Sequence, residues 1–183
     1  MKFFSYLSPA IFCFSLMLAG VSLPPTAFAA EGKTKAKACY SPIEVQAEEL
    51  LRLHSQLMVI TVTCHQGSNG ENLVSAYTGF TRDNIDDLHQ AEAIMKSHYK
   101  ARHGGDGIAQ LDVLRTKLGN EFGQIIADMS APAFCDFYRD KVTALSRNIP
   151  GQLENEVQRM TEESRTLVPP CKGAAMKVAD RNR

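Results

Sequence analysis

Apolar side chains recur every three or four residues along most of the chain after residue 40, which is the spacing of one face of an α-helix. One segment, residues 57–63, is rich enough in β-branched residues to suggest a strand. A strand needs a partner, and the chain after residue 30 has no second run of this kind. The sequence therefore predicts an all-α fold, a four- to five-helix bundle. The clearest apolar stripe consists of Leu111, Leu114, Leu118, Phe122, Ile125 and Met129.

Start and stop signals divide this pattern into five expected helices. Ser41 and Glu44 form an S-x-x-E capping box, and Pro42 suits the first turn of the helix that follows. Gly119 and Gly123 fall inside the clearest stripe, where they predict a close helix–helix crossing. The expected helices run from Pro42 to about Cys64, from Leu73 to the turn at 104–107, through residues 111–129, from Ala131 to the stop at 149–151, and from Gln152 to about Leu167.

Two of these helices carry a further expectation. The helix that begins at Leu73 contains Gly79, Thr81 and Asp83, which could interrupt it, with Thr81 capping a second segment. One kinked helix is the preferred interpretation. The last helix has a thinner apolar stripe than the others, which predicts a position on the outside of the bundle.

The first 29 residues have the pattern of a secretory signal peptide. Lys2 is the only charge in the first 30 residues, and the apolar centre, residues 10–21, is too short to span a membrane. Small residues at 27 and 29 predict cleavage between Ala29 and Ala30. No transmembrane segment is expected after cleavage, so the protein is expected to be periplasmic or secreted.

Removal of the signal peptide changes the cysteine count and the charge. Cys13 and Lys2 leave with it, so four cysteines remain and the balance of 20 basic and 20 acidic residues becomes 19 and 20. An even number of cysteines in an exported chain predicts two disulfides. Alternating helix directions place Cys64 and Cys135 at the same end of the bundle. Of the three possible pairings, these helix directions favour Cys64–Cys135 together with Cys39–Cys171.

The remaining chain is expected to form one domain, because its length suits a single core and 44% of the full sequence is apolar. Residues 30–41 are expected to form a basic arm, residues 42–168 the helical domain, and residues 169–183 a flexible basic tail. The near-neutral charge argues against nucleic acid as a partner, since such a protein needs a basic excess.

No catalytic motif is present, so no catalytic residue and no cofactor are expected. His54 and Met58, four residues apart, are weak candidates for holding copper. Asp86 and His89 belong to a D-x-x-H-x-x-E spacing, but no second such motif exists to complete a two-metal bundle site. A hydrolase remains a further alternative, with carboxylates drawn from Glu48, Glu49, Asp86 and Glu121.

Residues 57–64, 118–121 and 133–135 resemble segments of small exported helical, cysteine-containing proteins of Gram-negative bacteria. The resemblance covers roughly residues 50–145 and rests on apolar pattern and cysteine placement. It implies an exported helical fold and carries over no catalytic residue. The sequence thus favours a non-catalytic binding or interaction module of the cell envelope, whose partner is an envelope protein or a small ligand. The alternative is a periplasmic metal-binding or metal-handling protein.

Overall fold

The computed structural model describes residues 39–163 and 166–172. The described residues form helices and no strand beyond two isolated bridges. The all-α class is therefore confirmed, but the described residues form six helices instead of the four or five expected. No described helix has the length and apolar character needed to cross a bilayer. The helices are α1 (Pro42–Cys64), α2 (Leu73–Asp83), α3 (Ile85–His103), α4 (Ile108–Met129), α5 (Ala131–Leu145) and α6 (Gln152–Glu163).

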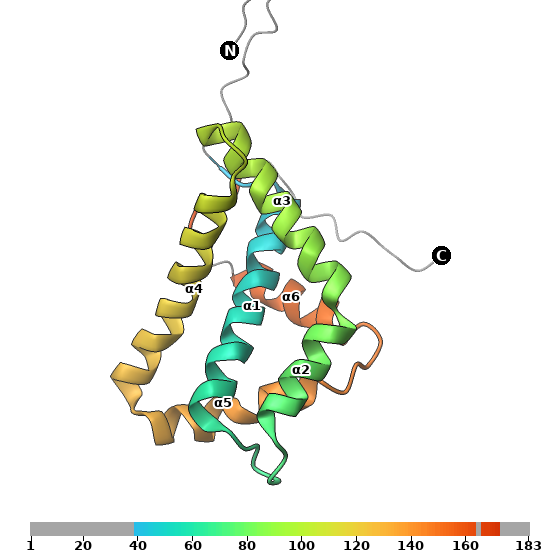
Figure 1. Ribbon diagram of the computed structural model, residues 1–183, viewed down its shortest axis with the longest axis vertical. Coiled ribbons are helices and arrows are strands. Elements are labelled where there is room, and N and C mark those ends of the chain that lie inside the picture. Colours follow the sequence, from blue (N-terminus) through green and yellow to red (C-terminus); the bar gives the residue numbers. More distant parts are fainter. Residues whose placement is uncertain (1–38, 164–165, 173–183) are drawn as a thin grey trace, which may run out of the picture. The chain divides into compact units, whose positions relative to one another are not determined.

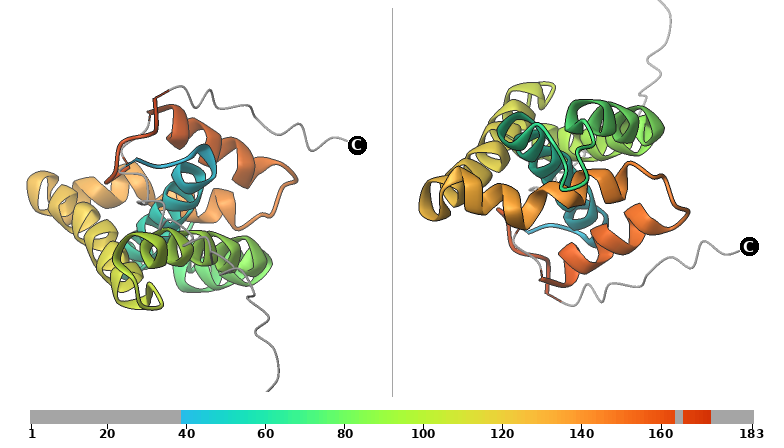
Figure 2. Two further views of the ribbon diagram at one scale, coloured as in Figure 1. Left: turned by 90° about the horizontal axis from the view of Figure 1, so that it is seen from above. Right: turned by 90° about the horizontal axis from the view of Figure 1, so that it is seen from below.

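Helix α1 lies at the centre of the helical unit and packs against each of the other five helices (Figures 1 and 2). Its side chains are buried around most of its circumference, which is the reason its sequence is apolar on nearly every side. The capping box also forms as expected, since Glu44 Oε2 accepts hydrogen bonds from Ser41 N at 2.6 Å and Ser41 Oγ at 2.7 Å.

The expected single helix from Leu73 to the 104–107 turn is wrong, because the chain breaks at Asn84 into α2 and α3. Both the backbone N and Nδ2 of Asn84 donate to Phe80 O, at 3.1 and 2.7 Å. An asparagine side chain competes with the backbone hydrogen bonds of a helix, so it favours a helix end. Thr81 does not cap the second segment. It lies inside α2, where its Oγ1 donates to Tyr77 O at 3.0 Å.

The expected close crossing at Gly119 and Gly123 is also wrong. A Cβ atom built on either residue would have no neighbour within 4 Å. The close approach occurs instead at Gly107, in the turn before α4, where such an atom would lie 2.3 Å from Lys96 O and where φ is +78°. Glycine is required there because it alone tolerates both the contact and the left-handed backbone.

The structure pairs Cys64 with Cys135 and Cys39 with Cys171, with Cα–Cα distances of 5.4 and 4.9 Å. These are the two pairs that the helix directions favour. The first joins the end of α1 to the beginning of α5. The second lies just before α1 begins. The two ends of the central helix are therefore both cross-linked.

Residues 166–172 run along the start of α1. Tyr40 N donates to Pro169 O at 3.0 Å, and Cys171 N donates to Tyr40 O at 2.8 Å. Residues 169–172 therefore pack on the helical unit, and α6 ends at Glu163 instead of near Leu167. The signal peptide with its Ala29–Ala30 cleavage site, most of the basic arm and residues 173–183 lie outside the described residues.

Although it was expected to lie outside the bundle, α6 contributes to the core. Its Met160 is buried, and its Leu153 and Val157 pack against two clusters of buried side chains. Helix α6 therefore contacts α1 directly and covers one side of it.

Candidate functional site

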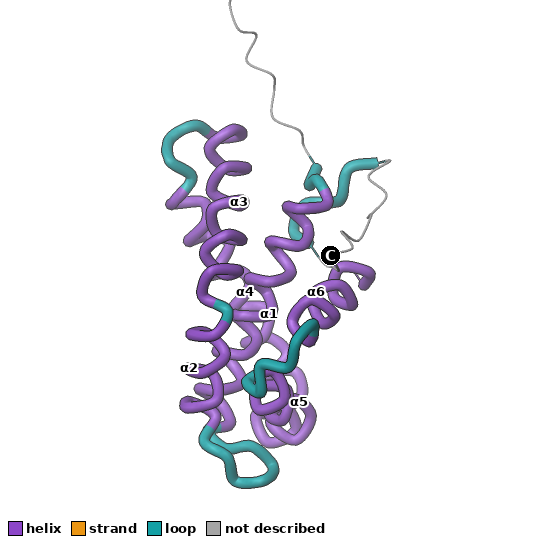
Figure 3. Tube along the Cα trace, turned by 90° about the vertical axis from the view of Figure 1, so that its right-hand side faces the viewer, coloured by secondary structure: helices purple, strands orange, loops and turns teal. Residues whose placement is uncertain are grey.

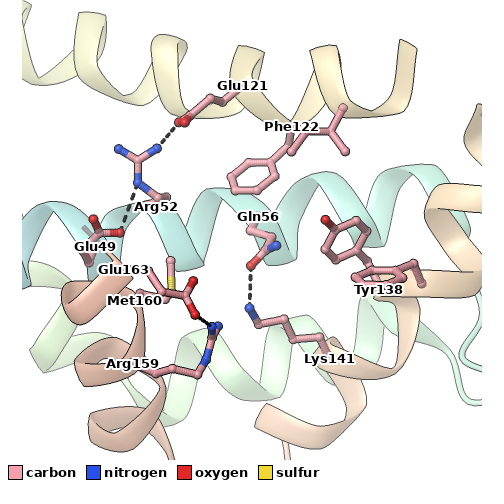
Figure 4. A pocket seen from close by; sticks show the side chains of 12 residues that line it. Glu49, Arg52, Gln56, Glu121, Phe122, Tyr138, Lys141, Arg159, Met160 and Glu163 are labelled. Atoms are coloured by element: carbon pink, nitrogen blue, oxygen red, sulfur yellow. Dashed lines mark hydrogen bonds and ion pairs between the residues drawn. The ribbon is translucent and has the colours of Figure 1, made fainter. Parts of the chain in front are cut away.

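A cavity of about 390 Å³ lies among α1, α4, α5 and α6, and we call it the charged pocket (Figure 4). Charged and aromatic side chains line most of it. The charged residues come from all four helices, and the aromatic residues come from α4 and α5. The lining residues are Glu49, Arg52, Gln56, Glu121, Phe122, Ile125, Phe137, Tyr138, Lys141, Arg159, Met160 and Glu163.

Arg52 is the centre of the charge network on the α1 side of this pocket. Its guanidinium contacts Glu48 at 2.8 Å and Glu49 at 3.2 Å, both on α1, and also pairs with Glu121 of α4. Glu48, Glu49 and Arg52 are 0, 1 and 3% exposed. Leu167 N also donates to Glu48 Oε1, at 2.7 Å. Buried carboxylates need such partners, so the ion pairs with Arg52 help to hold two of them inside the helical unit.

A second network forms the opposite wall. Lys141 of α5 donates to Gln56 Oε1 at 2.7 Å and pairs with Glu156 of α6 at 2.6 Å. Arg159 pairs with Glu156 at 2.8 Å and with Glu163 at 2.5 Å. Burial by itself raises the pKa of Glu156, but hydrogen bonds from Arg159 and Lys141 outweigh it and hold that pKa below its ordinary value.

The charged side chains that line the pocket balance. Three are carboxylates and three are cations: Glu49, Glu121 and Glu163, with Arg52, Lys141 and Arg159. Glu121 and Glu163 are substantially exposed, with 40 and 55% of the side chain in solvent, whereas among these three cations only Arg159 is comparably exposed. Exposed carboxylates in a partly enclosed site attract cations from solution.

Aromatic rings complete the pocket. Phe122 of α4 is buried, whereas Phe137 of α5 is 75% exposed. Phe137 packs edge-on against Tyr138, with ring centroids 4.7 Å apart. Single exposed apolar side chains are common on protein surfaces, so Phe137 is of interest because it lies at the charged pocket and not because it is exposed.

The candidate metal ligands do not come together. His54 Nε2 is hydrogen-bonded to Tyr77 Oη at 2.7 Å, and Met58 is exposed on α1. Asp86 and His89 are exposed on α3. Within residues 39–163 and 166–172, no three His, Cys, Asp or Glu side chains converge as a metal-binding group.

Three of the four carboxylates considered for a hydrolase do converge, because Glu48, Glu49 and Glu121 all contact Arg52. Asp86 does not join them. Sequence reasoning missed Arg52 itself, although the E-E-x-x-R spacing at 48–52 inside an apolar helix signals i,i+3 and i,i+4 ion pairs. The i,i+4 spacing places Phe137 and Lys141 on one face of α5, but nothing in the sequence indicated that this face would meet α1, α4 and α6 at a pocket.

No protein-family model, curated protein or solved structure matches this chain.

Proposed function

We propose that the protein is an exported, non-catalytic binding module whose charged pocket receives a positively charged group of a ligand or partner. The observation that carries the proposal is the pair of exposed carboxylates, Glu121 and Glu163, in a pocket that also has aromatic walls. Carboxylates attract a cation from solution, and aromatic faces stabilise an organic cation once water has left. A quaternary ammonium or guanidinium group has the chemistry that both features favour.

Binding is favoured over hydrolysis by the way the carboxylates are held. A hydrolytic carboxylate has to reach the substrate to transfer a proton or attack a bond. Glu48 and Glu49 are almost fully buried, and Arg52 contacts both. Of the carboxylates that line the pocket, only Glu121 and Glu163 have substantial exposure, and each pairs with an arginine. These groups can attract a cation at the rim, but their arrangement gives no separate acid and base.

Choline and its uncharged isostere 3,3-dimethyl-1-butanol provide the direct test. We expect choline to bind at least about tenfold more tightly, because only choline carries the charge that the pocket attracts. Chemical-shift changes at Phe137, Tyr138 and Glu163, followed during an NMR titration, would measure both affinities. Equal binding of the two compounds, or shifts elsewhere in the protein, would contradict the proposal.

A matched pair of variants sharpens the test. Glu163→Gln removes a carboxylate from the rim of the pocket, and we expect it to weaken choline binding about fivefold. Glu162→Gln removes the neighbouring carboxylate, which is hydrogen-bonded to Gln158 and does not line the pocket. This control should leave the affinity unchanged.

Export is the other part of the proposal, and the two disulfides support it because they persist in oxidising compartments. Expression of the full chain in a Gram-negative host should yield a periplasmic product that begins at Ala30. Intact-mass measurement would identify the first residue. We expect Ala29→Leu to block cleavage, because signal peptidase requires a small residue at that position. A cytoplasmic product with residues 1–29 intact would contradict export.

A further inference from the structure

A second concave surface lies on another side of α1, away from the contacts that form the charged pocket. Two cavities of about 610 and 280 Å³ share Ile43, Gln90 and Ile94 in their walls, so they form one continuous groove. We call it the α1–α3–α6 groove, since the first half of α1 lies between α3 and α6 there (Figure 3). Its apolar lining consists of Ile43, Ala47, Leu50, Ala91, Ala93, Ile94, Ala101, Leu153 and Val157.

The groove has apolar contact surface that the described helices leave uncovered. Ile43, in the first turn of the central helix, is 53% exposed. On α3, small side chains recur at every fourth position, Ala93, Ser97 and Ala101, and all three are exposed. Small residues at this spacing leave a shallow channel along a helix, which lets a second helix approach closely.

The charged residues that line the groove are all acidic, apart from a buried histidine. They are Glu44, Asp87 and Glu154, and no lysine or arginine of the described chain is among the lining residues. Glu44 is hydrogen-bonded to Ser41 and His98. Asp87 and Glu154 form no ion pair with the described part of the chain, so their charges remain available at the edge of the groove.

The dimensions fit a helix. The α3 wall extends from Asp87 to Ala101, about 21 Å at the rise of an α-helix. A partner helix of about four turns would cover that length. An apolar face with basic flanks would match both the aliphatic floor and the acidic edges.

We propose that the α1–α3–α6 groove is a docking site for an amphipathic helix of a partner protein, with basic residues beside its apolar face. A membrane surface matches the groove less well, because anionic lipid headgroups would repel Asp87 and Glu154. The proposal concerns a different surface from the charged pocket and does not depend on that pocket's ligand.

Two synthetic 18-residue helices test the proposal directly. One has leucine at i, i+3, i+4 and i+7 spacing with lysine elsewhere, and the other replaces every lysine with glutamate. We expect the full chain to bind the leucine–lysine peptide at least about tenfold more tightly, measured by fluorescence anisotropy at low salt. Equal affinities, or no binding of either peptide, would overturn the proposal.

Charge reversal identifies the surface used. Asp87→Lys with Glu154→Lys should reverse the preference in favour of the leucine–glutamate peptide. Glu71→Lys with Asp128→Lys makes the same change in net charge at exposed residues outside the groove, and it should keep the original preference. Circular dichroism would verify that both variants retain their helices. If both double variants change the preference equally, the interaction is only a response to net charge and the proposal fails.

Two further measurements distinguish peptide binding in the groove from binding in the charged pocket and from lipid binding. Glu163→Gln, in the charged pocket, should leave peptide binding unchanged. A loss of peptide affinity in this variant would mean that the peptide binds in the charged pocket instead of the groove. Vesicles of phosphatidylglycerol and phosphatidylcholine should not bind the protein. Vesicle binding that is abolished by Ile43→Ser would assign the groove to lipid and overturn the proposal.

Discussion

Arg52 contacts three carboxylates, and two of them are almost completely buried beside it on α1. Removing one member of a buried ion pair leaves an uncompensated charge, which costs more than the intact pair contributes. At the scale of single residues, the Arg52 guanidinium therefore stabilises the buried carboxylates of α1.

We expect Arg52→Ala to lower the free energy of unfolding by about 3 to 5 kcal/mol, because the buried carboxylate of Glu48 would lose its ion pair. Urea denaturation followed by circular dichroism would measure the change. The triple variant Glu48→Gln, Glu49→Gln, Arg52→Met should recover most of the loss, since it removes the charges and keeps the volume. A fully stable Arg52→Ala protein would contradict this account of the network.

The carboxylate of Glu156 predicts how stability responds to acid. Its pKa in the folded protein is below the ordinary value of 4.5, so it stabilises the fold above about pH 4.5 and this contribution is lost as the pH falls through the folded pKa. We expect Glu156→Gln to reduce the dependence of the unfolding free energy on pH below 4.5. Glu154→Gln, at an exposed position of the same helix, is the control, and an equal effect of both would contradict the assignment.

At the scale of helices, the sequence predicted those features that depend on neighbouring residues. The α1 capping box, the stripe of α4 and the glycine end of α3 follow from local patterns. The break at Asn84 was missed because it depends on the hydrogen bond that the asparagine amide makes to the backbone. The surroundings of Gly119 were predicted wrongly because residue spacing alone does not show which other atoms a helix face packs against. The charged pocket was missed for the same reason, since it joins residues of four helices.

The glycines of α4 and of the turn before it provide a matched test. Gly119→Ala should raise the free energy of unfolding by about 0.5 to 1 kcal/mol, because alanine favours the helix and the added methyl group meets no atom. Gly107→Ala should lower it by at least about 1 kcal/mol, because the methyl group would meet Lys96 O and φ is positive. Thermal and urea unfolding would measure both. The two variants must change the free energy of unfolding in opposite directions. A destabilising Gly119→Ala would mean that this face of α4 is covered.

At the scale of the whole helical unit, two disulfides act at the two ends of the central helix. Their sequence separations are 71 for Cys64–Cys135 and 132 for Cys39–Cys171. In the chain-entropy description, closing loops of these lengths stabilises a fold by about 4 and 5 kcal/mol. Since small domains have only about 5 to 15 kcal/mol in total, the two bridges are a large share of the stability.

We therefore expect proteins lacking one bridge to fold with lowered stability, and the protein lacking both to be mostly unfolded at 37 °C. Serine pairs at each disulfide would test this. Loss of Cys39–Cys171 should also speed hydrogen exchange at the amides of Tyr40 and Cys171, which hold residues 169–172 on the unit. Loss of Cys64–Cys135 should leave those amides protected. Uniform loss of protection in both variants would show that the two ends of α1 are not independent.

The Cys39–Cys171 bridge has a mechanical consequence. It joins the chain segments that enter and leave the helical unit, so force applied at either end of the chain reaches the helices at one shared point. The path between the two ends bypasses the helices, and pulling the ends apart loads the sulfur–sulfur bond before any helix. Whichever end is fixed to a surface, the charged pocket and the α1–α3–α6 groove are held from the same attachment point, and the helices remain unstretched.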